Sequence, residues 1–219
     1  MHTLLMKPTK PHLTLEQAFW SEDLLGVVGL DEAGRGALAG PVTAAAVVLP
    51  PDPDRVMKKL EGVRDSKLLT PAKREYWAAA VRATALAASV GEAEAHEIDS
   101  IGIVPATRLA MERALAGLHR EFEFLLIDYL LLPEIEADQV SLIKGDRQVM
   151  SIAAASILAK VARDEFMIEL NEPFPSYAFA NNKGYGTAQH LTALKQIGPC
   201  DYHRYSFRPV LKASQASPV

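Results

Sequence analysis

Hydrophobic residues in the chain occur mainly in short continuous runs. Residues 24–30, 42–49 and 86–92 are each of strand length, and the first two are followed by glycine- or proline-rich turns. Residues 123–132 and 139–144 are two further strand candidates. Continuous apolar runs of this length are typical of strands buried on both faces. The pattern therefore predicts a sheet built from these segments.

Helical spacing appears between the strand candidates. Thr70 and Pro71 are typical of an N-cap followed by a first helical residue, so we expect a helix over residues 71–85. Apolar residues at helical spacing predict a second helix over residues 104–119, and the alanine-rich segment 150–170 predicts a third that packs closely. Strands come first and helices become more frequent later, which indicates an α/β fold with a mixed sheet flanked by helices.

The length of the chain fits one domain. A chain of 219 residues can bury most of the surface that its unfolded form exposes. We expect a single domain over residues 1–219, with an α/β core at about 24–172 and a small helical C-terminal part at about 173–212. Residues 1–20 and 213–219 are expected to be peripheral.

The single cysteine, Cys200, excludes an internal disulfide and a multi-cysteine zinc site. A reducing cytoplasm is the natural location for such a chain. Charged residues and prolines interrupt the first 20 residues, so no secretory signal is expected. No apolar run reaches membrane-spanning length, and we expect no membrane partner.

The charge of the chain is unevenly distributed. The net charge of −4 argues against a nucleic-acid partner, because phosphate backbones are bound mainly by cations. Residues 181–219, however, contain five Lys or Arg and one acid, which gives +4 and leaves −8 for residues 1–180. The basic end could bind phosphates while acids elsewhere hold metal. On charge alone, a solvated basic tail is an equal alternative.

Three acids occur within or at the end of apolar runs. Asp31 and Glu32 end the first run, and Asp128 lies inside residues 123–132 without a local Lys or Arg. Buried carboxylates are costly unless they are paired, hydrogen-bonded or bound to a cation, and converging acids repel one another. Hard oxygen ligands favour Mg²⁺ or Mn²⁺. The alternative is that Asp31 or Asp128 caps a helix or pairs with a distant arginine.

A fourth acid, Asp146, lies between a short strand and the alanine-rich helix. It could be an anion at a helix N-terminus, where the helix dipole favours negative charge. It could equally be a fourth ligand, because site residues often lie where a strand ends before a helix.

Ordered sequence motifs add a family resemblance to these acids. The first motifs are GLDEAGRG at 29–36, LAGPV at 38–42 and DSK at 65–67; KGD at 144–146, KGYGT at 183–187 and HR at 203–204 follow in order. Together with Ser151 to Lys160, Arg163-Asp164, His190 and Ser206-Phe207, they resemble bacterial ribonuclease HII, the type 2 ribonuclease H family. The resemblance covers roughly residues 26–211, and many ordered motifs are more specific than one acidic pair.

The resemblance implies a ribonuclease H-like fold and an endonuclease. The expected substrates are RNA-DNA hybrids and duplex DNA with embedded ribonucleotides, nicked on the 5′ side of the ribonucleotide. It implies two Mg²⁺ or Mn²⁺ ions and products with 5′-phosphate and 3′-hydroxyl ends. The acids that match the metal-binding and catalytic positions are Asp31, Glu32, Asp128 and Asp146.

Substrate-binding residues are also implied by the resemblance. Gly34, Arg35 and Gly36 would present backbone groups to the ribose 2′-hydroxyl, which distinguishes RNA from DNA. Tyr185 would pack on the sugar that follows the ribonucleotide; without the motif around it, a core aromatic would be the better interpretation. The residues matched to phosphate contacts are Lys67, His190, His203 and Arg204. An isolated lysine or histidine is more often a solvated surface group. Lys160 and Asp164 fit an intrahelical pair with a structural role.

Two positions depart from the family pattern: Ala37 stands where proline is common, and Tyr129 where glycine often follows the third acid. Residues 212–219 lack a glutamine-and-aromatic motif, so docking on a replication clamp is not expected, and we expect a monomer. Two other functions remain open: a different metal nuclease on the same fold, and a catalytically silent nucleic-acid-binding module.

Overall fold

The computed structural model describes residues 10–216, which form a mixed sheet of five strands between helices. The strand order is β3-β2-β1-β4-β5, with β2 antiparallel to both of its neighbours and β4 parallel to both β1 and β5. The bounds of the strands are β1 Val27–Ala33, β2 Val42–Val48, β3 Ala87–Ala93, β4 Phe124–Asp128 and β5 Asp138–Leu142. The expected α/β class with a mixed sheet is confirmed.

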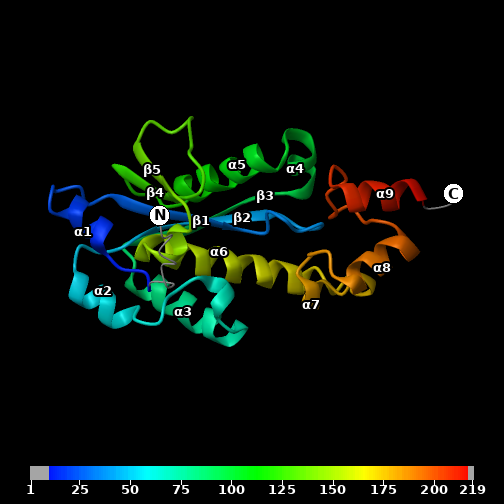
Figure 1. Cartoon of the computed structure of the whole chain (residues 1–219), viewed down its shortest axis with the longest axis horizontal. Coiled ribbons are helices and arrows are strands. Elements are labelled where there is room, and N and C mark those ends of the chain that lie inside the picture. The colour runs from blue at the N-terminus through cyan, green and yellow to red at the C-terminus, as the bar shows by residue number, and fades with distance from the viewer. Residues whose placement is uncertain (1–9, 217–219) are drawn as a thin grey trace, which may run out of the picture.

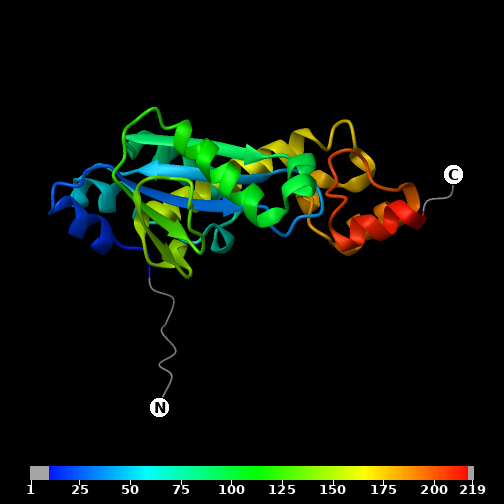
Figure 2. The same cartoon turned by 90° about the horizontal axis from the view of Figure 1, so that it is seen from above.

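Helices cover both faces of the sheet (Figure 1). The helices are α1 Thr14–Trp20, α2 Pro53–Lys59, α3 Pro71–Thr84, α4 Ala95–Ile101, α5 Ile103–Ala116, α6 Met150–Glu169, α7 Phe179–Asn182, α8 Ala188–Ile197 and α9 Arg208–Ala216. One apolar cluster joins the sheet to α5, and another joins the opposite face to α3 and α6. Figure 2 shows α8 and α9 beyond one end of the sheet, at the opposite end from α1.

Small side chains allow α6 to pack closely on the middle of the sheet. Ala153, Ala154 and Ala155 are fully buried. A Cβ atom on Gly29 of β1 would collide with the backbone of Ser151. The predicted alanine-rich helix is therefore present, and its side chains are small because close packing on β1 leaves no room for larger groups.

Several predicted boundaries were wrong. The first strand covers Val27–Ala33 rather than residues 24–30, so it includes Asp31 and Glu32. The strand expected over residues 123–132 ends at Asp128, because Tyr129 has a left-handed backbone (φ 67°) that an extended strand does not accommodate. The short helices α2 and α4 were not expected from the pattern.

The ends of the described chain belong to the fold rather than to its periphery. His12 forms an isolated parallel bridge with Val149, and Leu13 is buried in the apolar cluster under α6. At the other end, α9 buries Val210 and Ala213 in a C-terminal apolar cluster. The expectation that residues 1–20 and 213–219 are peripheral is therefore wrong for these residues; 1–9 and 217–219 lie outside the described residues. No helix among residues 10–216 is long and apolar enough to cross a membrane.

Candidate functional site

Parallel strands bring the predicted acids to one edge of the sheet. Leu30 of β1 is paired with Ile127 of the parallel strand β4. The next residues on the two strands, Asp31 and Asp128, are therefore neighbours. Strand β5 is parallel to β4 and leads into the 3-10 turn Gly145–Arg147, which contains Asp146. Because parallel strands end at the same edge, residues nearly 100 positions apart in the sequence become neighbours.

Asp31 is the most buried of the four acids, with 6% of its surface exposed. Its Oδ1 accepts a hydrogen bond from the amide of Glu32 at 2.7 Å. Burial raises the pKa of Asp31 well above its ordinary value, and repulsion from Glu32, Asp128 and Asp146 raises it further. The carboxylate therefore lies in a region that favours added positive charge.

Glu32 is only partly neutralised by a cation. Its Oε1 lies 3.4 Å from Nη1 of Arg35, while its Oε2 is buried without a hydrogen-bond partner among the described residues. Burial raises the pKa of Glu32, and the positive charge of Arg35 opposes this increase. A buried carboxylate oxygen without a partner is costly, and a bound cation would satisfy it.

The third and fourth acids are held by the turn after β5. The amide of Gly145 donates to Oδ1 of Asp128 at 2.8 Å. Burial raises the pKa of Asp128. Burial, together with the nearby charges of Asp65 and Asp128, raises the pKa of Asp146 to about 6. All four predicted acids thus favour added positive charge, from protons or from cations.

This donor set suits a hard divalent cation, because carboxylate oxygens are its preferred ligands. Within residues 10–216, however, no three His, Cys, Asp or Glu side chains already lie in a metal-binding arrangement. Two features of these residues fit a bound cation: the raised pKa values of the four acids and the unpartnered Oε2 of Glu32.

A buried arginine of α6 fixes the position of the turn after β1. Arg163 donates from its three guanidinium nitrogens to the carbonyls of Ala39, Pro41 and Lys183, at 2.9–3.0 Å. Gly34 has φ 92°, and a Cβ atom there would collide with Arg163. A Cβ atom on Gly36, by contrast, would meet nothing within 4 Å. Packing within the protein therefore explains Gly34, while open space at Gly36 leaves room for a ligand.

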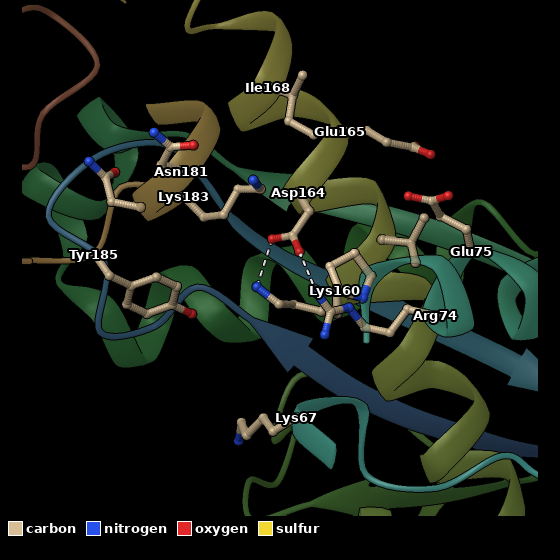
Figure 3. Close-up of a pocket in the computed structure, with 13 residues that line it drawn as sticks. Lys67, Arg74, Glu75, Lys160, Asp164, Glu165, Ile168, Asn181, Lys183 and Tyr185 are labelled. Atoms are coloured by element: carbon tan, nitrogen blue, oxygen red, sulfur yellow. Dashed lines mark hydrogen bonds and ion pairs between the residues drawn. The ribbon is translucent and has the colours of Figure 1, made fainter. Parts of the chain in front are cut away.

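Two adjoining cavities of about 470 Å³ each lie at the site. The first is lined by Asp31, Glu32 and the turn at 33–36, together with Lys67, Lys160 and Tyr185. The second shares Lys67, Lys160 and Tyr185 and is lined in addition by Arg74, Asp164 and Lys183. Figure 3 shows Arg74 and Lys160 each paired with one carboxylate oxygen of Asp164, at 3.3 and 2.6 Å. The acids are thus continuous with a groove rich in cations.

Comparisons with known proteins agree with this geometry. The family model of ribonuclease HII matches residues 28–210. The chain belongs to the ribonuclease HII family. A Synechococcus ribonuclease HII is 48% identical over 204 residues, covering 93% of this chain and 91% of that protein.

Solved structures of relatives share the fold. Ribonuclease H2 from Pyrococcus horikoshii OT3 has a TM-score of 0.72 and 25% identity, over 86% of this chain and 97% of that one. The ribonuclease HII of Archaeoglobus fulgidus, solved in complex with PCNA, has a TM-score of 0.66 and 26% identity, over 88% and 89% of the two chains. As a family member, this chain is an endoribonuclease that hydrolyses the RNA strand of RNA-DNA hybrids.

Lys67 and Tyr185, two of the residues expected to bind substrate, are accessible in the folded chain. Lys67 is exposed and lines both cavities. Tyr185 is 36% exposed, and Lys160 and Arg163 lie 5.7 and 5.4 Å from the centroid of its ring. A core aromatic, the alternative interpretation of Tyr185, would not line a cavity in this way.

Three residues expected to contact phosphates are fully buried instead: His190, His203 and Arg204. Arg204 donates to the carbonyls of Gly40 and Arg35 at 3.0 and 2.9 Å, so it supports the turn from inside. A phosphate contact needs an accessible donor, so this part of the prediction is corrected. The sequence motifs identified residues that support the site, but they did not show that these side chains are buried rather than facing the substrate.

The two histidines form one hydrogen-bonded chain toward Tyr185. The amide of Cys200 donates to Nδ1 of His203 at 3.0 Å, which leaves the proton of this ring on Nε2. That Nε2 donates to Nε2 of His190 at 3.0 Å, and Nδ1 of His190 donates to the carbonyl of Tyr185 at 3.0 Å. Burial lowers the pKa of His203 to about 4, so both rings are neutral at pH 7 and hold the Tyr185 segment in place.

Asp65 is a site residue that the sequence reasoning missed. It is almost fully buried, accepts from the amide of Lys67 at 2.9 Å and pairs with Arg147 at 2.9 Å. It therefore connects the segment of Lys67 with the turn of Asp146. Its place in the DSK motif was the available signal, but the partner Arg147 is 82 residues away.

Proposed function

We propose that this enzyme nicks duplex DNA on the 5′ side of an embedded ribonucleotide, using two Mg²⁺ or Mn²⁺ ions held by Asp31, Glu32, Asp128 and Asp146. The observation that carries the proposal is the convergence of the four acids, from β1, the end of β4 and the turn after β5, next to the Gly34–Gly36 turn. Their raised pKa values support it. The acids alone fit many metal nucleases. The adjoining turn and Tyr185 are the reason for proposing a ribonucleotide as the target.

Each residue has a defined part in this reaction. Divalent cations at the four acids would supply the positive charge that activates an attacking water and stabilises the leaving 3′ oxygen, giving 5′-phosphate and 3′-hydroxyl ends. The amide of Gly145 orients the carboxylate of Asp128 for this role. Arg35 holds Glu32, and the positive charge of Lys67 lowers the cost of keeping Asp128 ionised.

Substrate selection belongs to the turn and the groove. Gly36 leaves space for the ribose to approach the backbone, where amides and carbonyls can bind its 2′-hydroxyl. Tyr185 would pack on the next sugar. Lys67 and the cations of the second cavity would bind phosphates, which position the duplex without reading its bases.

The test presents duplex DNA with one ribonucleotide in Mg²⁺ or in Mn²⁺, with the products analysed for cut position and end chemistry. We expect a nick on the 5′ side of the ribonucleotide. Asp31→Asn should abolish nicking while duplex binding persists. Asp138→Asn is a matched control, because Asp138 is an exposed acid at the start of β5, away from the strand ends that carry the site.

The outcomes separate the competing functions. Binding without cutting by the wild-type protein would indicate a silent nucleic-acid-binding module. Equal cutting of all-DNA duplexes would indicate a different metal nuclease. Tyr185→Ala should reduce cutting at RNA-DNA junctions while the melting temperature stays close to that of the wild type.

We further propose that the enzyme acts as a monomer without a replication clamp. The Archaeoglobus fulgidus relative was solved with PCNA. Residues 212–219 of this chain lack a glutamine-and-aromatic motif, and 217–219 lie outside the described residues. Gel filtration with and without a clamp protein tests both expectations.

A further inference from the structure

Tyr129 has an unusual conformation for a large aromatic residue. It directly follows the predicted metal ligand Asp128, has φ 67°, and is 60% exposed. Its amide donates to the carbonyl of Leu142 at 3.0 Å, which closes the end of β4 against β5. A β-carbon in the left-handed region is disfavoured, and glycine adopts this conformation without cost. The residue therefore carries backbone strain without burying its ring.

The ring of Tyr129 lies against Arg35, a cation of the turn at residues 33–36. The guanidinium carbon of Arg35 is 5.5 Å from the ring centroid. Arg35 also pairs with Glu32 through Nη1, so the ring contacts the arginine that holds one of the four acids. The ring is thus at the rim of the acid site.

We propose that Tyr129 is a substrate-binding residue: its exposed ring, backed by Arg35, packs on the flat face of a nucleotide next to the cut. This inference rests on the proposed function. Aromatic rings and guanidinium planes bind the faces of bases and sugars whatever the sequence, because every nucleotide has such a face. Tyr185, approached by Lys160 and Arg163, is a second ring with the same kind of support.

A purely structural role for the ring makes a different prediction. If Tyr129 only covered the Arg35–Glu32 pair, its removal would disturb the acids and lower kcat without a specific effect on KM. If it binds substrate, removal of the ring raises KM and leaves kcat nearly unchanged, because the acids keep their supports.

The test uses Tyr129→Gly and Tyr129→Asn, since both residues tolerate a left-handed backbone and both lack the ring. We expect a higher melting temperature for Tyr129→Gly together with a KM for the single-ribonucleotide duplex raised roughly 5- to 100-fold. Tyr129→Phe should restore a KM close to that of the wild type. Asp23→Gly is a matched control, because Asp23 is another exposed left-handed residue (φ 61°), at the end of α1; it should raise stability without raising KM.

A duplex with an abasic nucleotide beside the ribonucleotide identifies the face that is bound. If the ring stacks on the base, Tyr129→Gly and wild type will have the same KM on the abasic duplex; if it packs on the sugar, the difference will persist. Either result supports the inference. An unchanged KM in both ring-removal variants, or a fall in kcat alone, overturns it, while nicking by the wild type in the same assay leaves the proposed function intact.

Discussion

Replacing Asp146 by asparagine should stabilise the metal-free fold, and the stabilisation should increase with pH. In the folded protein the pKa of Asp146 is raised from 3.8 to about 6, first by burial and then by the charges of Asp65 and Asp128. A raised pKa means that the folded state holds the proton more tightly than the unfolded chain. The contribution of this group to stability is therefore complete below pH 3.8 and is lost as pH rises through about 6.

The size of the effect follows from the same two values. The difference between 3.8 and about 6, at about 1.4 kcal/mol per pH unit, corresponds to a loss of about 3 kcal/mol at neutral pH. Asparagine keeps the shape of the side chain but has no charge, so Asp146→Asn should be more stable than the wild type by up to about this amount at pH 7. At pH 4 the two proteins should be nearly equal.

Urea unfolding in EDTA, followed by circular dichroism from pH 4 to pH 7.5, measures this difference. The variant must be compared with the wild type at each pH, because His203 has the opposite pH dependence. Addition of Mg²⁺ should then stabilise the wild type more than the variant. A stability difference that stays constant across this pH range, or that favours the wild type at pH 7 without metal, would refute the electrostatic reasoning.

Three other substitutions test the supports of the site. His203→Gln should reduce the loss of stability on acidification, by up to about 3 kcal/mol in the same urea titration. The pKa of His203 is lowered from 6.5 to about 4, so the contribution of this histidine to stability is present above pH 6.5 and is lost as pH falls through about 4. Arg163→Lys should cost about 3 kcal/mol in urea unfolding, because an ammonium group cannot reach all three carbonyls; a loss below 1 kcal/mol would contradict this. Glu16→Ala should lower stability by about 1 kcal/mol at pH 4, since Glu16 accepts from the amide of Ser151 at 2.8 Å in the first turn of α6; burial raises the pKa of Glu16, so this loss should shrink as pH rises and the buried carboxyl ionises. Glu16→Gln keeps an acceptor oxygen and should cost less; equal losses would show that the hydrogen bond is unimportant.

Local patterns were sufficient to predict most of the sheet and the long helices. Strand β2 and helix α3 lie within one residue of their expected ends, because a continuous apolar run and a Thr-Pro start are local signals. The same signals singled out Asp31 and Asp128 as charges in apolar surroundings. Their meeting at one sheet edge depends on the parallel pairing of β1 with β4, which the sequence pattern did not specify.

The orientation of the matched polar residues was decided by tertiary structure alone. Lys67 and His190 both belong to family motifs, yet one is exposed in two cavities and the other is fully buried. Contacts between segments far apart in the chain made this difference, and so did the pairing of Asp65 with Arg147. A sequence shows which residues are chemically able to act, because side-chain chemistry and local spacing are written in it. Which of them reach the substrate depends on burial and on long-range partners, which exist only in the folded chain.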